Sequence, residues 1–421
     1  MRWSPLLFGV PALLAILVRI STVPPYAQAA NTYKVLHAFG KGKDGAGVFS
    51  GVALNSKGNL YGATTGGGAY GEGTVFELAS GSDGQWREAI LHNFCRPDHC
   101  DDGGLVWDTP ALDSKGNLYD VSSAGIFQMT PGTRGWSFRL IHGFGAESAL
   151  PPDEPGLSDL LLDAAGNLYG TFGVGKNYYG AVGELSPGTH GWEEKNLFDF
   201  CLHPRNGVCL SGSDPGYRLA WDTTGNLYGV TLEGGLNTSG VVYRLEHTTG
   251  GWKERVLHNF RSSASDGYYP YTGPIVDRIG NVYGTTQEGG GGGGCDGEGC
   301  GAVYKLSRGA DGRWVETILY NFPTLKDGAG PSGTLAMDPA GNLYGVAGGG
   351  IGPCGGGGCG VVYKMTPDSN GKWTYTVLHR FIGTDGALPV AGPTLDDKGK
   401  VYGTTTTGGP GGYGVVFEIM P

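Results

Sequence analysis

The sequence predicts an all-β fold, a seven-bladed β-propeller with four antiparallel strands in each blade. A G-N-L-Y-G signature or a close variant occurs seven times along the 421 residues. Every apolar segment between these signatures is short and rich in Val, Leu, Tyr, Phe and Trp, with no helical periodicity. A unit of about 56 residues that holds four such segments is typical of a propeller blade.

The first two strands of each repeat form a hairpin. An apolar residue followed by Asp or Asn, as in Leu112-Asp113, comes shortly before each signature. Two or three residues separate this pair from the Gly that opens the signature. An Asp that caps the backbone and a Gly with positive φ are the composition of a tight turn. Because small residues and glycine precede this hairpin, we place its first strand innermost, at the crowded axis. The signatures start at Gly58, Gly116, Gly166, Gly225, Gly280, Gly341 and Gly399.

The third and fourth strands explain how the ring closes. The third is an apolar run that follows Gly, and the fourth begins with an aromatic residue and ends in Phe, as in Trp86 to Phe94. A copy of the fourth strand, Tyr33 to Phe39, opens the repeat region, and the last repeat stops at Ile419 without one. Pairing these two ends leaves no unpaired sheet edge. An open solenoid is the alternative, but it needs polar capping repeats that neither end shows.

The first 29 residues predict a signal peptide. Arg2 precedes an apolar run from Leu6 to Val18, and the small-residue pattern Ala27-Gln28-Ala29 suits cleavage after Ala29. We expect residues 30–421 to form one propeller domain that is secreted, periplasmic or extracellular. The apolar run is shorter than the roughly 20 residues that span a bilayer, so no membrane insertion is expected after cleavage. A retained N-terminal anchor is the alternative.

The eight cysteines predict disulfide bonds. An even number in close pairs, behind an export signal, is typical of oxidised proteins. Zinc binding is the competing interpretation, but the pairs lack C-x2-C spacing and lie in different repeats. Each disulfide would close a short loop and contribute about 2 kcal/mol. The pairs are Cys95 and Cys100, Cys201 and Cys209, Cys295 and Cys300, and Cys354 and Cys359.

Charge and recurrence exclude several kinds of partner. The net charge of −10 argues against nucleic acid and anionic membranes. We expect no cofactor and a monomer. Asp-Gly steps in the long connections could gather calcium, but a feature of nearly every blade is better explained as a loop cap. These steps start at Asp44, Asp102, Asp266, Asp327 and Asp385.

Two aromatic residue types recur in the outer strand. Five histidines hold the same place in different blades, so they cannot converge on one metal, and we expect them to pack between blades. The Trp at the head of this strand is expected to pack in the same way. The histidines are His37, His92, His142, His258 and His379.

The recurring G-N-L-Y-G-x-T and G-x-V-[FY]-x-L motifs resemble the GloVer (Gloeo/Verruco) tandem-repeat family of bacterial exported proteins. The resemblance covers residues 33 to 421, where seven copies match in order. It implies secretion and a repeat propeller. It implies no established activity and no catalytic residues.

A ligand site is expected on one face of the ring. Alternate connections of antiparallel strands lie on opposite faces, so the two longer loop classes share a face that carries all the cysteines. We expect a site there or at the channel mouth beneath it, built from residues that break the repeat. Carboxylates and histidines suit acid–base work, and tyrosines can stack on sugar rings. The candidates are His99, Asp101, Asp102, Asp153, Glu154, His203, Arg205, Asn206, Tyr268, Tyr269 and Tyr271.

None of these residues has a spacing that specifies a reaction, so no catalytic residue is predicted. The leading hypothesis is an exported, non-catalytic module that binds a polysaccharide, a cell-surface component or a protein. A secreted hydrolase or lyase with a polar cluster over the channel is the first alternative, and a structural surface protein is the second. Candidates that converge on the axis would favour the enzyme, and scattered ones would favour the binding module.

Overall fold

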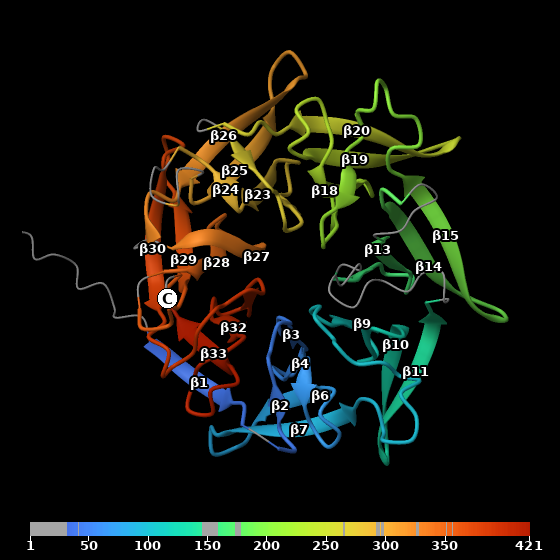
Figure 1. The fold of residues 1–421 in the computed structure, drawn as a ribbon, viewed down its shortest axis with the longest axis vertical. Coiled ribbons are helices and arrows are strands. Elements are labelled where there is room, and N and C mark those ends of the chain that lie inside the picture. Colours follow the sequence, from blue (N-terminus) through green and yellow to red (C-terminus); the bar gives the residue numbers. More distant parts are fainter. Residues whose placement is uncertain are drawn as a thin grey trace, which may run out of the picture. The chain divides into compact units, whose positions relative to one another are not determined.

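The computed structural model describes residues 32–421 except 41, 145–158, 173–177, 264–265, 292–294, 296–298, 326–327, 351 and 356. The predicted signal peptide lies outside the described residues. Seven antiparallel sheets surround a central axis, six with four strands and that of the fourth blade with one additional strand, which confirms the seven-bladed propeller (Figure 1). Within the described part, no helix is long and apolar enough to cross a membrane.

Each blade runs from an inner strand at the axis, which has two residues in every blade but the sixth, to a long strand at the rim. The first three blades are β3 (Ala53–Leu54), β4 (Leu60–Thr64), β6 (Thr74–Ser80) and β7 (Trp86–Asn93); β8 (Ala111–Leu112), β9 (Leu118–Ser122), β10 (Gly125–Gly132) and β11 (Gly135–Gly143); and β12 (Leu161–Leu162), β13 (Leu168–Phe172), β14 (Ala181–Gly188) and β15 (Gly191–Asp199).

The fourth blade is β17 (Ala220–Trp221), β18 (Leu227–Glu233), β19 (Val241–Thr248) and β20 (Gly251–Asn259). The fifth is β22 (Ile275–Val276), β23 (Val282–Thr286), β25 (Ala302–Arg308) and β26 (Trp314–Asn321). The sixth is β27 (Ala329–Met337), β28 (Leu343–Gly349), β29 (Val361–Pro367) and β30 (Trp373–Arg380), in which β27 is longer than the other inner strands. The seventh is β31 (Thr394–Leu395), β32 (Val401–Thr405), β33 (Val415–Met420) and β1 (Thr32–Ala38).

The two ends of the ring meet as predicted. β1 pairs with β33 in antiparallel register, from Thr32 opposite Met420 to Ala38 opposite Val415. The register shifts between Val35 and His37, and the other outer strands shift at the corresponding place. The strand from the beginning of the ring therefore replaces the missing outer strand of the seventh blade without distortion.

The repeat signature is explained by one hydrogen-bond network at the inner hairpin. In the second blade, Asp113 Oδ1 accepts bonds from the backbone N–H groups of Lys115 and Asn117. Asp113 Oδ2 accepts the Asn117 side-chain amide and the Tyr119 hydroxyl. Gly116 has a φ of 83°, a conformation that L side chains rarely adopt. The Asp, Gly, Asn and Tyr of the signature are thus parts of one tight turn.

The hydrophobic core lies between blades. One cluster combines Leu60 and Phe76 of the first blade with Tyr402 and Val416 of the seventh. Four of the outer-strand tryptophans pack edge-on against the signature tyrosine of the preceding blade, as Trp136 does against Tyr61. The same contact recurs for Trp86, Trp192 and Trp373, which confirms the predicted packing role. Each sheet is therefore stabilised on both faces by its neighbours.

The longer connections meet one another on one face of the ring, as expected. Short strands tie them together in the first blade, β2 (Gly45–Ala46) with β5 (Gly66–Gly67), and in the fifth, β21 (Gly267–Tyr268) with β24 (Glu288–Gly289). In the fourth blade β16 (Ser213–Pro215) pairs with β18. All eight cysteines lie in these connections and form the four predicted local disulfides. The disulfides indicate an oxidising extracellular or periplasmic environment.

Candidate functional site

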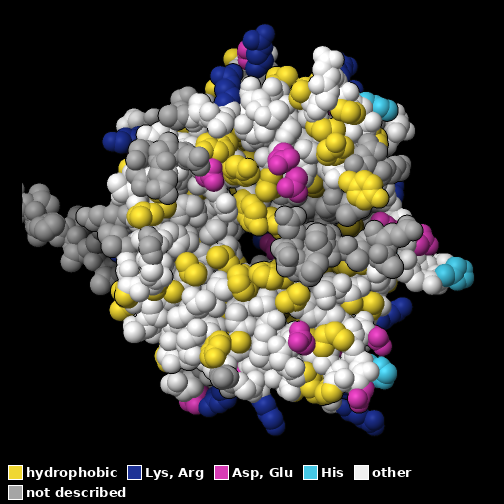
Figure 2. All heavy atoms as spheres, viewed as in Figure 1, with side chains coloured by type: hydrophobic (Ala, Val, Ile, Leu, Met, Phe, Trp, Pro, Cys, Tyr) yellow, Lys and Arg dark blue, Asp and Glu magenta, His cyan; other side chains and the backbone are white. Residues whose placement is uncertain are grey.

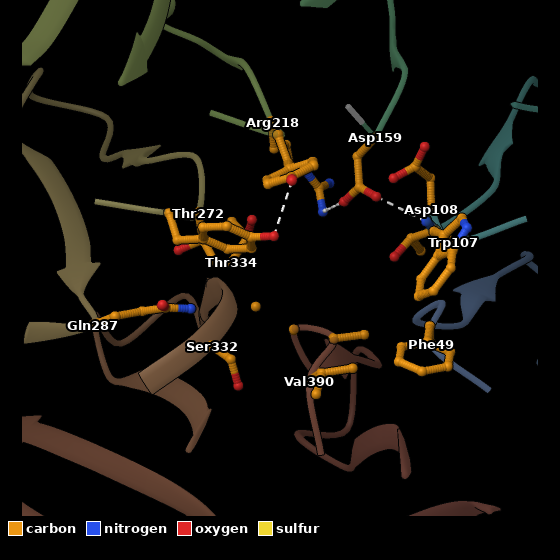
Figure 3. Close-up of a pocket in the computed structure, with 16 residues that line it drawn as sticks. Phe49, Trp107, Asp108, Asp159, Arg218, Thr272, Gln287, Ser332, Thr334 and Val390 are labelled. Carbon is orange, nitrogen blue, oxygen red and sulfur yellow. Dashed lines mark hydrogen bonds and ion pairs between the residues drawn. The ribbon is translucent and has the colours of Figure 1, made fainter. Parts of the chain in front are cut away.

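A cavity of about 540 Å³ lies at the axis, where the segments that lead into the inner strands meet. All seven blades contribute to its wall, and Figure 3 shows the side chains that surround it. Figure 2 shows an opening at the centre of the ring, bordered by hydrophobic side chains. The lining residues used below are Phe49, Trp107, Asp108, Thr109, Asp159, Tyr217, Arg218, Tyr271, Thr272, Gln287 and Thr334.

Glycine allows these segments to approach closely. A Cβ atom on Gly392 would collide with the Thr334 carbonyl oxygen, and one on Gly273 would collide with the Arg218 carbonyl oxygen. Neighbouring segments around the axis therefore pack backbone against backbone, which agrees with the glycine that the sequence places before the inner strands. This packing fixes the neighbouring side chains around the cavity.

An ion pair holds one side of the cavity. Arg218 Nη1 donates to Asp159 Oδ2 at 3.2 Å, across the interface between the third and fourth blades. Asp159 Oδ1 accepts the backbone N–H of Thr109, in the second blade, at 2.8 Å. One carboxylate thus connects three blades at the wall of the cavity.

Asp108 lies beside this ion pair and has a free carboxyl group (Figure 3). It is 8 % exposed, and it makes no hydrogen bond with any residue that the structure describes. Burial raises the pKa of Asp108 well above its usual value, and the charges of Asp159 and Asp120 raise it further. Asp108 is therefore a buried acid whose carboxyl group is available to a ligand in the cavity.

Asp120 is the third carboxyl group in this region. It is 1 % exposed, and it stands in β9 at the position where the other six signatures have glycine. Its Oδ1 accepts the Val121 N–H, but its Oδ2 is buried without a hydrogen-bond partner. Burial raises the pKa of Asp120 well above its usual value, against the lowering effect of the Val121 bond, and the Asp159 charge raises it further.

Two aromatic pairs form the remaining walls. The rings of Phe49 and Trp107 lie 4.4 Å apart, and those of Tyr217 and Tyr271 lie 4.6 Å apart. The Tyr271 hydroxyl donates to the Tyr217 hydroxyl at 2.9 Å. Burial raises the pKa of Tyr217 far above its usual value, so this phenol stays neutral at physiological pH. The cavity thus combines flat apolar surfaces with carboxyl, guanidinium and hydroxyl groups.

The residues predicted from the sequence are scattered over the long-loop face. Among the candidates that the structure describes, only Tyr271 lines the cavity. Asp102 caps its loop through the Cys95 N–H, and Tyr268 lies in β21 beside Tyr269. Asp153 and Glu154 lie outside the described residues. The remaining candidates are exposed on the disulfide-closed loops: His99, Asp101, His203, Arg205 and Asn206.

The recurring Asp and His residues have the structural roles predicted for them. Asp44, Asp102, Asp266 and Asp385 each accept a backbone N–H of their own loop, which confirms capping for those described. Each also lies within reach of the histidine at the end of the preceding outer strand. All five histidines contact a neighbouring blade: His379 stacks on Tyr33 with a ring separation of 3.7 Å and His92 stacks on Phe138, whereas the other three face a glutamate.

Asp108, Asp159, Arg218 and Trp107 were missed by sequence reasoning. They precede the inner strands in connections whose lengths differ between blades, so these residues do not align with one another when the repeats are compared. One signal was available, because Asp120 breaks a position that is glycine in every other copy. Asp120 does not line the cavity, but its carboxyl group interacts with Asp108 and Asp159, which do.

The fold defines the class of protein: a seven-bladed β-propeller whose axial cavity is lined by all of its blades. The Gloeobacter/Verrucomicrobia repeat matches residues 109–296 and 215–421 in two overlapping regions. The chain therefore belongs to this repeat family, as its motifs predicted. No curated protein matches the chain in sequence.

Solved structures share the fold at low sequence identity. A catalytically inactive virginiamycin B lyase from Staphylococcus aureus with quinupristin is 12 % identical, with a TM-score of 0.53 over 93 % of this chain and 99 % of that one. The extracellular domain of a hybrid two-component system from B. thetaiotaomicron is 10 % identical, with a TM-score of 0.56 over 91 % of this chain and 39 % of that one. YCF48 from Cyanidioschyzon merolae is 13 % identical, with a TM-score of 0.51 over 92 % and 98 %. The functions of these proteins differ, so the likeness concerns the propeller alone.

Proposed function

We propose that this protein is an exported binding module that holds a carbohydrate in the axial cavity. The observation that carries the proposal is the free, buried carboxyl group of Asp108 in a cavity walled by two aromatic pairs. Sugars present apolar C–H faces and many hydroxyl groups. Aromatic faces match the former, and carboxyl, guanidinium and amide groups match the latter.

The dimensions and the polar groups of the cavity support a small glycan or the end of a longer one. Its volume of about 540 Å³ falls within the roughly 300–1,000 Å³ of typical small-molecule sites. Asp108, Arg218 and Gln287 offer hydrogen bonds from three different blades. A polysaccharide could enter through the opening on the long-loop face and leave most of its length outside.

The binding proposal is tested with a glycan array, followed by calorimetry on the best ligand. We expect Trp107→Ala to weaken binding by about tenfold or more, because loss of an aromatic contact costs on the order of 1.4 kcal/mol. Tyr70→Ala is the matched control, since Tyr70 is an exposed aromatic residue of the first blade outside the cavity. An array without signal above background, or equal losses in both variants, would refute carbohydrate binding at this site.

A hydrolase or lyase is the second candidate, and it is favoured by the neighbouring carboxyl groups of Asp108 and Asp159. The raised pKa favours the protonated form of Asp108, which can donate a proton to a leaving group. Asp159, paired with Arg218, offers a carboxylate beside it. Two carboxyl groups in different environments are the arrangement of acid–base catalysis.

Turnover separates the two candidates. The array ligand is incubated with the protein, and the products are analysed by chromatography. If the protein is an enzyme, Asp108→Asn should reduce the rate by about 10²- to 10⁴-fold, the usual contribution of a general acid, while binding is retained. Intact ligand after long incubation with the unmodified protein would leave the binding module as the function.

A further inference from the structure

Outer strands of neighbouring blades place two side-chain positions against each other around the rim. The first is the position of the recurring histidine in one outer strand. The second is in the outer strand of the next blade, four residues before that strand's own histidine position. The contacts with described partners are His37 with Glu88, His92 with Phe138, His142 with Glu194, His258 with Glu316, Tyr320 with Tyr375, and His379 with Tyr33. These contacts are therefore of two kinds, aromatic stacks and histidine–glutamate pairs.

Where an aromatic residue faces the histidine, the histidine bonds tightly to its own loop aspartate. His92 Nε2 lies 2.8 Å from Asp102, and His379 Nε2 lies 2.9 Å from Asp385. These two interfaces are complete, because the ring stacks on an aromatic face and the imidazole nitrogen has one carboxylate partner. They show what the interface looks like without a second carboxylate.

Where a glutamate faces the histidine, the imidazole nitrogen is shared between two carboxylates. His37 Nε2 lies 3.3 Å from Asp44 and 3.8 Å from Glu88. At the second such interface, His258 Nε2 lies 3.4 Å from Asp266 and 3.6 Å from Glu316. The histidine–aspartate separation is thus longer at both interfaces than at the aromatic ones.

Each of these clusters contains a buried carboxylate oxygen without a hydrogen bond. Glu88 Oε1 and Glu316 Oε1 have no partner among the described residues. Burial raises the pKa of both glutamates to about 7, although the histidine opposes this shift. Each cluster therefore brings two carboxyl groups and one imidazole together around a glutamate oxygen that has no hydrogen bond among the described residues.

From this geometry we infer that His37, Asp44 and Glu88 form one divalent-cation site, and that His258, Asp266 and Glu316 form a second, each suited to zinc. Within each cluster the candidate ligand atoms lie within 4.8 Å of one another. A tetrahedral zinc ion with bonds near 2.1 Å needs ligand atoms roughly 3.4 Å apart, and one nitrogen with two carboxylate oxygens is a donor set that zinc accepts. The ion would pair with the free glutamate oxygen and join two blades at the rim.

Other places in the described chain lack one of these features. Glu194 is 53 % exposed, so its pair with His142 is open to water. Glu254 holds the glutamate position in β20, but Phe198 stands where the histidine would be. The group of Cys95, Cys100 and Asp102 is occupied by a disulfide, which leaves no thiolate to bind a metal.

The test uses the mature chain after treatment with EDTA and dialysis, titrated with ZnCl₂ by calorimetry in the presence of a competing chelator. We expect two tight sites and a higher thermal midpoint with zinc. Glu88→Gln and Glu316→Gln should each remove one site, and the double variant should lose both sites and the thermal shift. His92→Gln is the matched control, because that interface has no glutamate, and it should keep two sites.

A second pair of variants protects the test against misfolding. Glu88→Phe and Glu316→Phe copy the interface of His92 with Phe138, which the same fold already accommodates. We expect these variants to fold and to lose zinc binding. An unmodified chain without tight sites, or a folded double variant that still binds two ions, would overturn the inference.

Discussion

Removal of residues 1–39 is expected to lower and broaden the thermal unfolding transition of the propeller, whereas removal of residues 1–29 alone should leave its thermal midpoint unchanged. The longer deletion removes β1, so the seventh blade keeps three strands and β33 becomes an exposed edge. It also removes Leu36 and Phe39 from the core between the seventh and first blades. Circular dichroism melting and light scattering would detect a lower, broader transition and association through the free edge.

A point variant tests the same closure without truncation. Phe39 is fully buried and lies 5.2 Å from Phe76, ring to ring, and Phe381 is the fully buried residue at the same place in the sixth blade. Phe39→Ala and Phe381→Ala should each cost about 3–5 kcal/mol, the usual loss for a buried phenylalanine. Similar losses in urea unfolding would show that the closing strand is as firmly held as an internal one. A loss below about 1 kcal/mol for Phe39→Ala alone would contradict closure by β1.

The parts of the fold that the sequence predicted are those set by local chemistry repeated seven times. Asp113, Asn117 and Tyr119 form their network within seven residues, so the pattern of one copy is enough to identify a hairpin. Closure of the ring followed from the order of strand types at the two ends. Neither prediction required knowledge of how distant loops face one another.

The cavity could not be predicted in the same way, because its polar groups meet only after the ring has closed. Thr109 and Asp159 are 50 residues apart, and Asp159 and Arg218 are 59 residues apart. Each precedes an inner strand in a connection whose length varies between blades. The sequence predicted a site on the long-loop face or at the channel mouth beneath it. Residues on the disulfide-closed loops broke the repeat more visibly, so most of the named candidates lie on those loops.

Replacement of Asp120 by glycine is expected to stabilise the protein at neutral pH. The substitution restores the residue of the other six blades and removes a buried carboxyl group with an unpaired oxygen. An unsatisfied buried polar group costs about 1–3 kcal/mol, and more when charged, while glycine in a strand costs roughly 0.5–1 kcal/mol. We expect a net gain of about 1–2 kcal/mol in the free energy of unfolding at pH 8, measured in urea. A variant less stable than the unmodified protein at that pH would refute this account.

The stabilisation by Asp120→Gly is expected to increase with pH. The pKa of Asp120 in the folded protein lies above its ordinary value of 3.8, so the folded state binds this proton more tightly than the unfolded state does. Below pH 3.8 both states are protonated and the charge penalty is absent. The penalty grows as the pH rises from 3.8 toward the folded pKa. The gain from Asp120→Gly should therefore be larger at pH 8 than at pH 4, and Asp120→Asn, which removes the charge at nearly constant size, should show the same trend.

The carboxyl group of Asp120 also affects the axial cavity, through the pKa of Asp108. The Asp120 charge contributes to the raised pKa of Asp108, so Asp120→Gly should lower the pKa of Asp108 while leaving the cavity wall in place. If carbohydrate binding or turnover requires protonated Asp108, the variant should lose it at a lower pH than the unmodified protein does as the pH is raised. A binding profile that is unchanged between pH 5 and pH 8 in this variant would separate Asp120 from the site. A shifted profile would show that Asp120, which lowers the stability of the second blade, also keeps the pKa of Asp108 high in the cavity.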